Sequence, residues 1–230
     1  MTILLDNISV TVTRDDILER IEHSPERRPS ERVLSHIDSC LSRYQGLISA
    51  RGAYAVRTIE GNDGRSLTLS GGIHFDAWNL ALAFRGCTNA AVFIVTIGDA
   101  IEQEASRLMN QGHGIQGYIL DAIGSCAAES AADGLQAELE KVAGNRNQAI
   151  TLRYSPGYCG WDIVEQKLLF QAIDASRVGV SLTDSCLMLP RKSISAIVGM
   201  GEPGVVAEAP CPCEQCDNDS CPARRMPRRE

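Results

Sequence analysis

The stretch Arg-Tyr-Ser-Pro-Gly-Tyr at residues 153–158 places a cation, a tight turn and an aromatic ring close together. Arg153 offers a planar fork of N–H groups that suits a carboxylate, and Gly157 after a proline allows a sharp turn and close backbone approach. Tyr158 and Trp161 offer aromatic faces on which a purine or a cation can pack. A ligand that joins an amino acid to an adenosine requires these parts. A surface turn with an arginine salt bridge explains the same residues without a ligand.

Further blocks on both sides of this stretch give the chain a resemblance to a known family. An arginine, three residues and then Gly-Tyr, as in residues 153–158, resembles the motif of the activation domain of cobalamin-dependent methionine synthase. Leu-Thr-Asp-Ser at 182–185, Met-Leu-Pro at 188–190 and Ser-Ile-Ser at 193–195 resemble the blocks that follow it in that family. Ala-Glu-Ser-Ala-Ala-Asp at 128–133 resembles the helix before it. The chain is most similar to the short, stand-alone members.

The resemblance implies that this loop binds S-adenosylmethionine (AdoMet). The candidate cofactor-binding residues of the loop are Arg153, Ser155, Gly157, Tyr158 and Trp161. Glu129 and Asp133, one helical turn apart, are expected either to line the ligand pocket or to form a solvated helix face. The chain departs from the family after Tyr158, where Cys-Gly-Trp-Asp replaces a proline-rich stretch. It also has no clear counterpart of the family's downstream ligand-contacting tyrosine.

The resemblance further implies a role in the rescue of oxidised cobalamin. In the family, one-electron reduction coupled to methylation by AdoMet reactivates cob(II)alamin, and the activation domain presents the methyl group to cobalt held by another domain. The chain has no cobalamin signature of the Asp-x-His-x-x-Gly type. We therefore expect the cobalamin on a separate corrinoid-dependent methyltransferase, by default methionine synthase, and a flavodoxin- or ferredoxin-like electron donor. The catalytic work would be positioning and charge complementarity.

Two other functions stay open at the level of sequence. A chain that kept this fold but lost AdoMet binding would be a non-catalytic assembly or chaperone subunit of a corrinoid methyltransferase. The missing downstream tyrosine motivates that hypothesis. A chain whose C-terminal cysteines are the active part would instead be an iron–sulfur electron donor for corrinoid activation.

Four cysteines lie close together near the C-terminus. They are Cys211, Cys213, Cys216 and Cys221. Four thiolates are the ligand set of tetrahedral zinc and of iron–sulfur clusters, and a reducing compartment keeps such thiols available. The tail is therefore a candidate zinc or iron–sulfur site, with a cysteine-rich segment that binds no metal as the alternative. The five other cysteines are scattered among apolar neighbours and are expected to be small buried side chains.

Composition narrows the range of partners. The chain is 44% hydrophobic and 22% charged, with a formal net charge of -7 and a pI near 5.2. The acidic balance argues against broad binding to nucleic acid or to anionic membranes. The N-terminal residues lack the basic and apolar regions of a signal peptide, and no apolar run approaches the roughly 20 residues of a membrane span. We expect a cytoplasmic protein.

The elements that must position these residues predict an α+β fold. We expect one domain over residues 1–204, with a twisted, largely antiparallel sheet flanked by helices, and a cysteine-rich tail at 205–230. Strands are expected at residues 8–13, 52–59, 66–69, 90–97 and 193–200. Helices are expected at about 13–21, 30–47, 100–110, 116–143 and 164–175. The long alanine-rich helix would carry Glu129 and Asp133 ahead of the loop that contains Arg153.

Overall fold

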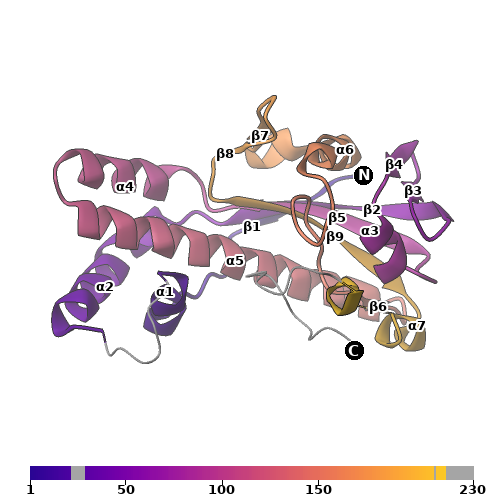
Figure 1. Cartoon of the computed structure of the whole chain (residues 1–230), viewed down its shortest axis with the longest axis horizontal. Helices are drawn as coiled ribbons and strands as arrows, with labels where there is room; N and C mark the ends of the chain where they lie inside the picture. Colours follow the sequence, from indigo (N-terminus) through magenta and orange to yellow (C-terminus); the bar gives the residue numbers. More distant parts are fainter. Residues whose placement is uncertain (22–28, 210, 216–230) are drawn as a thin grey trace.

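A central antiparallel sheet organises the molecule (Figure 1), of which the computed structural model describes residues 1–21, 29–209 and 211–215. The strand order is β4-β3-β2-β5-β9-β6, and β1 pairs with β2 beside this path. The strands of this sheet are β1 (Ile3–Asp6), β2 (Arg51–Asn62), β3 (Leu67–Leu69), β4 (Ile73–Phe75), β5 (Asn89–Thr96), β6 (Ala149–Ile150) and β9 (Ser193–Gly201). A separate hairpin consists of β7 (Ser181–Leu182) and β8 (Met188–Leu189).

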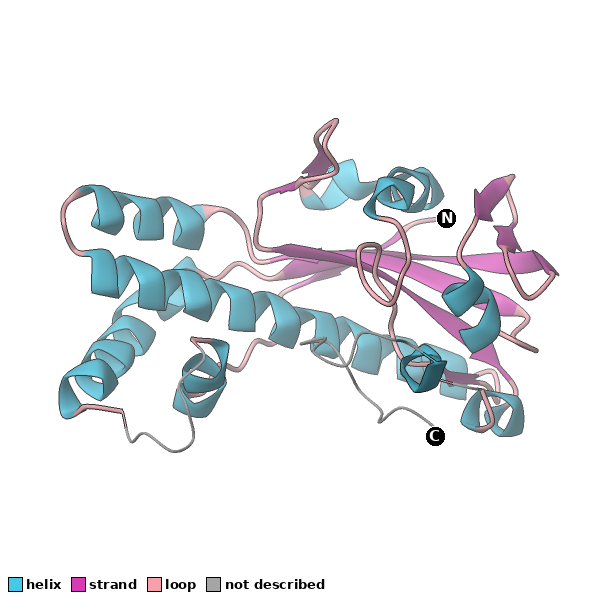
Figure 2. Ribbon diagram, in the orientation of Figure 1, coloured by secondary structure: helices cyan, strands magenta, loops and turns pink. Residues whose placement is uncertain are grey.

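Helices cover both faces of the sheet (Figure 2). The α-helices are α1 (Arg14–Arg20), α2 (Glu31–Tyr44), α3 (Trp78–Ala83), α4 (Ala100–Asn110), α5 (Gly114–Gly144), α6 (Gln166–Ala172) and α7 (Pro203–Ala207). The 3-10 turns are η1 (Gln45–Leu47), η2 (Ile163–Glu165), η3 (Ala175–Val178) and η4 (Pro212–Gln215). α5 runs along one face, while α6 and the β7–β8 hairpin lie on the other. The predicted α+β class with a largely antiparallel sheet is confirmed.

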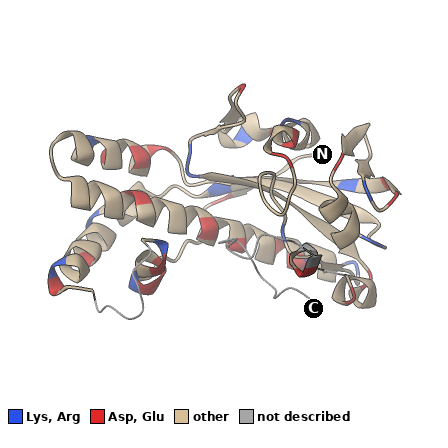
Figure 3. Ribbon diagram, in the orientation of Figure 1, with Lys and Arg blue, Asp and Glu red and all other residues tan. Residues whose placement is uncertain are grey.

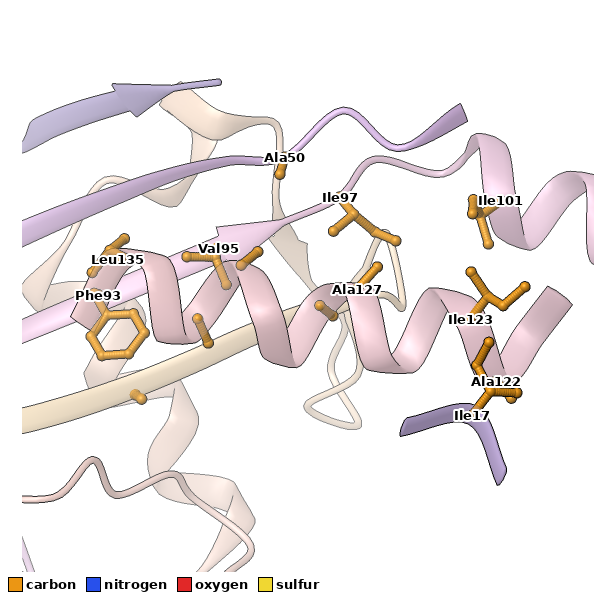
Figure 4. Close-up of a cluster of buried hydrophobic side chains, with 14 of the residues drawn as sticks. Ile17, Ala50, Phe93, Val95, Ile97, Ile101, Ala122, Ile123, Ala127 and Leu135 are labelled. Carbon is orange, nitrogen blue, oxygen red and sulfur yellow. The ribbon is translucent and has the colours of Figure 1, made fainter. Parts of the chain in front are cut away.

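Strand β5 is apolar from Ala90 to Val95 because both of its faces are buried. Phe93 and Val95 point into a core shared with α1, α2, α4 and α5, and Figure 4 shows them with residues of α1, α4 and α5. The alternate residues Val92 and Ile94 point into a second core, shared with α3, α6, β3 and β4. Successive side chains of a strand face opposite sides of the sheet, so a strand between two cores loses the apolar–polar alternation.

The long helix α5 is the scaffold on which the acidic candidate residues stand. Its 31 residues include the fully buried Ala127, Ala131 and Ala132, which allow the helix axis to come close to the sheet. Glu129 and Asp133 are exposed because they fall on the side of the helix away from this buried face. The predicted helix at 116–143 is confirmed, and its polar positions are available for a site.

The prediction of a strand at residues 8–13 is wrong. These residues lie outside the sheet, and the strand that does form here is β1, which pairs with β2 through residues 3–6. Ile8, Val10 and Val12 are partly buried against the first core, and the backbone N–H of Thr11 donates to Ser130 Oγ of α5 at 2.9 Å. The apolar residues of this segment are therefore on its buried side, as the alternation predicts. That side packs on a helix instead of pairing with a neighbouring strand.

Helix starts were predicted more accurately than the short elements. Thr13 caps α1 in a capping box with Asp16, and the Ser30 side chain accepts from the backbone N–H of Val33 at the start of α2. The short elements β1, β4, α3 and α7 were not predicted. Each has at most six residues, which is too short for periodicity to show. The domain boundary at residue 204, inside α7, stays a prediction.

Candidate functional site

Arg153 lies at the edge of the sheet, next to the surface of α5. β6 pairs with β9, and Tyr154 continues that edge through two backbone hydrogen bonds of 2.9 Å with Ile197. The Tyr154 ring enters the second core, where it lies edge-on to Phe84 with a centroid distance of 5.9 Å. Because neighbouring residues of an extended chain point to opposite faces, Arg153 points towards α5.

A compact loop follows at residues 155–161. Gly157 has a φ of 89°, and its N–H donates to the carbonyl of Trp161 at 2.8 Å, which closes the loop. The buried Asn79 of α3 donates from Nδ2 to the carbonyl of Cys159 at 2.8 Å and holds the loop against the second core. The glycine predicted to allow a sharp turn therefore does so, since L-residues rarely adopt this φ.

Arg153 is already engaged by three acceptors on α5. Its Nη2 donates to Glu129 Oε2 at 2.8 Å, and its Nη1 donates to Asp133 Oδ1 and, at 3.2 Å, to Gln136 Oε1. The arginine side chain is only 12% exposed, whereas Glu129 and Asp133 are 54% and 68% exposed. A guanidinium carries five N–H groups, so within the described residues these bonds leave two N–H groups that a ligand could accept from.

A cavity of about 470 Å³ opens beside this cluster. Its walls come from the loop at 152–163, the start of α6, the β7–β8 hairpin, the first residues of β9 and the C-terminal turn η4. Three arginines, Arg20, Arg153 and Arg191, and one carboxylate, Glu129, line it. The volume lies within the range of about 300–1,000 Å³ that small-molecule sites occupy, and the lining carries both signs of charge.

Buried polar side chains form part of the cavity wall. Gln166 is 3% exposed; its Nε2 donates to the carbonyl of Cys186 at 3.1 Å, and its Oε1 accepts from Ser195 Oγ at 3.2 Å. Ser193 is also buried, with its Oγ donating to the carbonyl of Pro190 at 2.7 Å. These bonds fix the side chains, so the cavity presents rigid polar groups that need little reordering when a ligand binds.

The structure brings together part of the predicted site. Arg153, Ser155, Tyr158 and Glu129 line the cavity, and the exposed Tyr158 ring lies at its surface. Gly157 and Asp133 stand next to lining residues without lining it themselves. Sequence reasoning missed several lining residues, namely Arg20, Gln166, Cys186, Met188, Arg191, Ser193 and Ser195. The blocks at 188–190 and 193–195 resemble the family, but the resemblance gives these residues no role. Their place in the cavity wall is seen only in the folded structure.

Trp161 is a core side chain in this structure. It is 2% exposed, its ring lies edge-on to Phe75 with a centroid distance of 5.3 Å, and its Nε1 donates to Glu165 Oε2 at 2.6 Å. Glu165 Oε1 in turn accepts from the backbone N–H of Asp76 at 2.9 Å. The indole thus anchors the loop to the second core. Ligand contact by Trp161 stays an untested prediction, and Tyr158 is the better-placed aromatic.

The predicted metal site falls partly outside the described residues. Cys216 and Cys221 lie beyond them, while Cys211 and Cys213 lie at η4 and line the cavity. Within residues 1–21, 29–209 and 211–215, no three His, Cys, Asp or Glu side chains are grouped as metal ligands. Zinc or an iron–sulfur cluster at the tail therefore stays a prediction. Burial raises the pKa of the Cys211 thiol.

Comparisons with known proteins define the class first by fold. The structure is similar to a crystal structure of the MetH reactivation domain bound to AdoHcy, with a TM-score of 0.60 and 14% identity, over 86% of this chain and 78% of that chain. At this identity the similarity shows a common fold. A search of curated proteins found no match.

A sequence match then identifies the family. The family model described as "Vitamin B12 dependent methionine synthase, activation domain" matches residues 83–204, which is more than half of the chain. The chain therefore belongs to the activation-domain family of vitamin B12-dependent methionine synthase. The matched range contains Glu129, Asp133 and the loop with Arg153, while the cysteine tail lies outside it. The expected family is confirmed.

Proposed function

We propose that this chain binds AdoMet in the cavity beside Arg153 and supports reductive re-methylation of cob(II)alamin on a separate corrinoid-dependent methyltransferase, by default methionine synthase. One observation carries the proposal: Arg153, Ser155 and Tyr158 of the family motif line a single cavity of about 470 Å³. Membership of the activation-domain family and the AdoHcy bound to the structural relative support the same ligand class.

The charges of the cavity suit the amino-acid end of AdoMet. The two remaining N–H groups of Arg153 would bind the methionyl carboxylate, and Glu129 would face the ammonium group. The Tyr158 ring, 52% exposed, would pack against the adenosine or the sulfonium cation. The chain's own contribution is to orient the methyl group, since no general base is needed for its transfer.

The corrinoid would belong to the partner protein. Its cobalt would receive one electron from a flavodoxin- or ferredoxin-like donor and the methyl group from AdoMet, whose carbon–sulfur bond breaks with the electron pair left on the sulfur of AdoHcy. The residues of this chain would bind AdoMet, the methyl donor, and orient its methyl group towards the cobalt. The partner and the electron donor are both part of the proposal.

The test is methyl transfer from labelled AdoMet to a corrinoid methyltransferase in the cob(II)alamin state, with a low-potential reductant. We expect label on the corrinoid only when this chain and the reductant are both present, and an initial rate at least tenfold lower with Arg153→Ala. Arg14→Ala is the matched control, because Arg14 pairs with Asp38 on the surface outside the cavity. AdoMet binding without any label transfer would overturn the proposed reaction.

A second function is favoured by the same arginine. Arg153 is 12% exposed and held by Glu129, Asp133 and Gln136, so it could serve the fold alone. The chain would then be a non-catalytic assembly subunit of a corrinoid methyltransferase. In that case the chain would raise the yield of corrinoid-loaded partner, and Arg153→Ala would lower the stability of the chain without changing any AdoMet titration.

A further inference from the structure

The C-terminal turn η4 lies against the body of the domain. The N–H of Glu214 donates to the carbonyl of Cys211 at 3.0 Å, which closes the turn, and η4 packs against α3. Cys213 is 6% exposed and Cys211 is half-buried. Both side chains line the same cavity as Arg153 and Glu129. A segment far along the chain from the motif therefore forms part of the wall of the candidate site.

The cavity collects cysteine side chains from three separate segments. Cys159 of the loop and Cys186 of the β7–β8 hairpin line it together with Cys211 and Cys213. Cys40, Cys87 and Cys126 do not line it. Thiols are small and polarizable, so this wall suits the sulfonium centre and adjoining methylene groups of AdoMet, whose charged amino-acid end would be bound by Arg153 and Glu129.

We propose that η4 is a wall of the AdoMet site and that Cys211 and Cys213 contact the bound ligand. The proposal rests on the proposed function and adds binding residues from the cysteine segment, which lies outside the region matched by the family model. Tight sites enclose most of the ligand surface, so this wall contributes to affinity directly. It gives the first two tail cysteines a role that needs no metal.

The first test is a calorimetric titration of the full chain with AdoMet. Cys211→Phe places a large ring on the cavity wall and is expected to weaken binding at least tenfold. Ala207→Phe is the matched control: it adds a similar ring at an exposed position of α7 that does not line the cavity, and should leave affinity within twofold. Thermal melting checks that both variants are folded.

The outcomes separate this inference from the function on which it rests. If wild type and Cys211→Phe bind AdoMet equally well, η4 is not a wall of the AdoMet site, and the proposed function still stands. Equal weakening by both substitutions would also overturn it, because the effect would then come from disturbing the segment. No binding by folded wild-type protein would overturn both proposals.

Thiol footprinting tests the contact without a substitution. Cys126 is the reference thiol, because it is half-buried like Cys211 but lies between α5 and α1, outside the cavity lining. With a maleimide probe, saturating AdoMet should slow alkylation of Cys211 at least fivefold and leave Cys126 unchanged. Equal rates at Cys211 with and without AdoMet would contradict the contact. Tight binding of one zinc ion that blocks AdoMet would instead assign these thiols to a metal.

Discussion

In the proposed function Arg153 has two roles, holding the loop on α5 and binding a ligand. Its bonds to Glu129, Asp133 and Gln136 fix the guanidinium on α5, and within the described residues two N–H groups remain that would bind a carboxylate. Because the Arg153 side chain is already ordered in the free protein, less conformational entropy is lost when a ligand binds. The pairs are half-exposed on their acidic side, so removing the arginine leaves carboxylates that water can still solvate.

The two acidic partners of Arg153 should differ in their effect on ligand binding. Glu129 lines the cavity and Asp133 does not, although both bind the same guanidinium. We expect Glu129→Gln to weaken AdoMet binding about tenfold, which is about 1.4 kcal/mol, and Asp133→Asn to weaken it less than about twofold. Calorimetric titration of the two variants measures both effects. Equal losses would show that the acids act only by holding Arg153.

The Cys87 thiol makes a pH-dependent contribution to the free energy of unfolding. Burial raises the pKa of its thiol from 9.0 to about 11. The unfolded chain therefore ionises this thiol at lower pH than the folded chain, and the free energy of unfolding should fall as pH rises from about 9 to about 11. Urea denaturation across this range should show a steeper fall for the wild type than for Cys87→Ala. Parallel curves would contradict the assignment.

At the residue scale the sequence predicted the motif but only part of the site. Residues adjacent in the chain, such as Arg153, Ser155 and Tyr158, could be nominated together from spacing and resemblance. Gln166 and Ser195 could not, because a hydrogen bond between α6 and β9 brings them to one wall. Trp161 lies in the second core and anchors the loop there, and its contact with a ligand stays a prediction.

At the element scale, α4 and α5 pack closely because α5 has a glycine at their contact. A Cβ built on Gly117 would lie 2.6 Å from Met109 Cγ and 2.8 Å from the carbonyl oxygen of Ala105. Backbone cannot move aside as a flexible side chain can, so this contact requires a residue without a side chain. The pair of helices then holds the end of α5 that precedes Glu129.

Adding a methyl group at this contact should destabilise the protein. We expect Gly117→Ala to lower the free energy of unfolding by about 2 kcal/mol. Gly114→Ala on the same helix is the matched control, because its Cβ would have no heavy atom within 4 Å. It should raise stability by up to about 1 kcal/mol through the entropy of the unfolded chain. Urea denaturation compares them, and similar stability of the two variants would refute the close contact.

Long elements were predicted from sequence, whereas several of the short ones were not. Strand β5 and helix α5 each have enough residues for composition and periodicity to show, and both were found within a few positions of their ends. The extended segment at 8–13 was misassigned because period-2 burial appears wherever an extended chain lies on a flat apolar surface, whether that surface is a sheet or a helix. The three-residue strand β4 depends on its partner, which local patterns do not identify, whereas β3 falls within the strand predicted at 66–69.

At the scale of the whole molecule, the site lies where the sheet edge, α5 and the C-terminal turn meet. Lysine and arginine are spread over the described part of the ribbon and not gathered on one element, as Figure 3 shows. No helix in this part of the chain is long and apolar enough to cross a membrane. The cavity instead has its own local arginines, so the proposed recognition of a carboxylate would depend on the cavity and not on the net charge of -7.

Calorimetric titration of the full chain with AdoMet tests directly whether the cavity beside Arg153 binds this ligand, with wild type, Arg153→Ala and the control Arg14→Ala compared. We expect saturable binding with one site, a loss of at least about tenfold in Arg153→Ala, or about 1.4 kcal/mol, and unchanged binding in Arg14→Ala. All three proteins should remain folded, as thermal melting would show. Absence of binding by folded wild-type protein, or equal affinity of wild type and Arg153→Ala, would contradict an AdoMet site in this cavity.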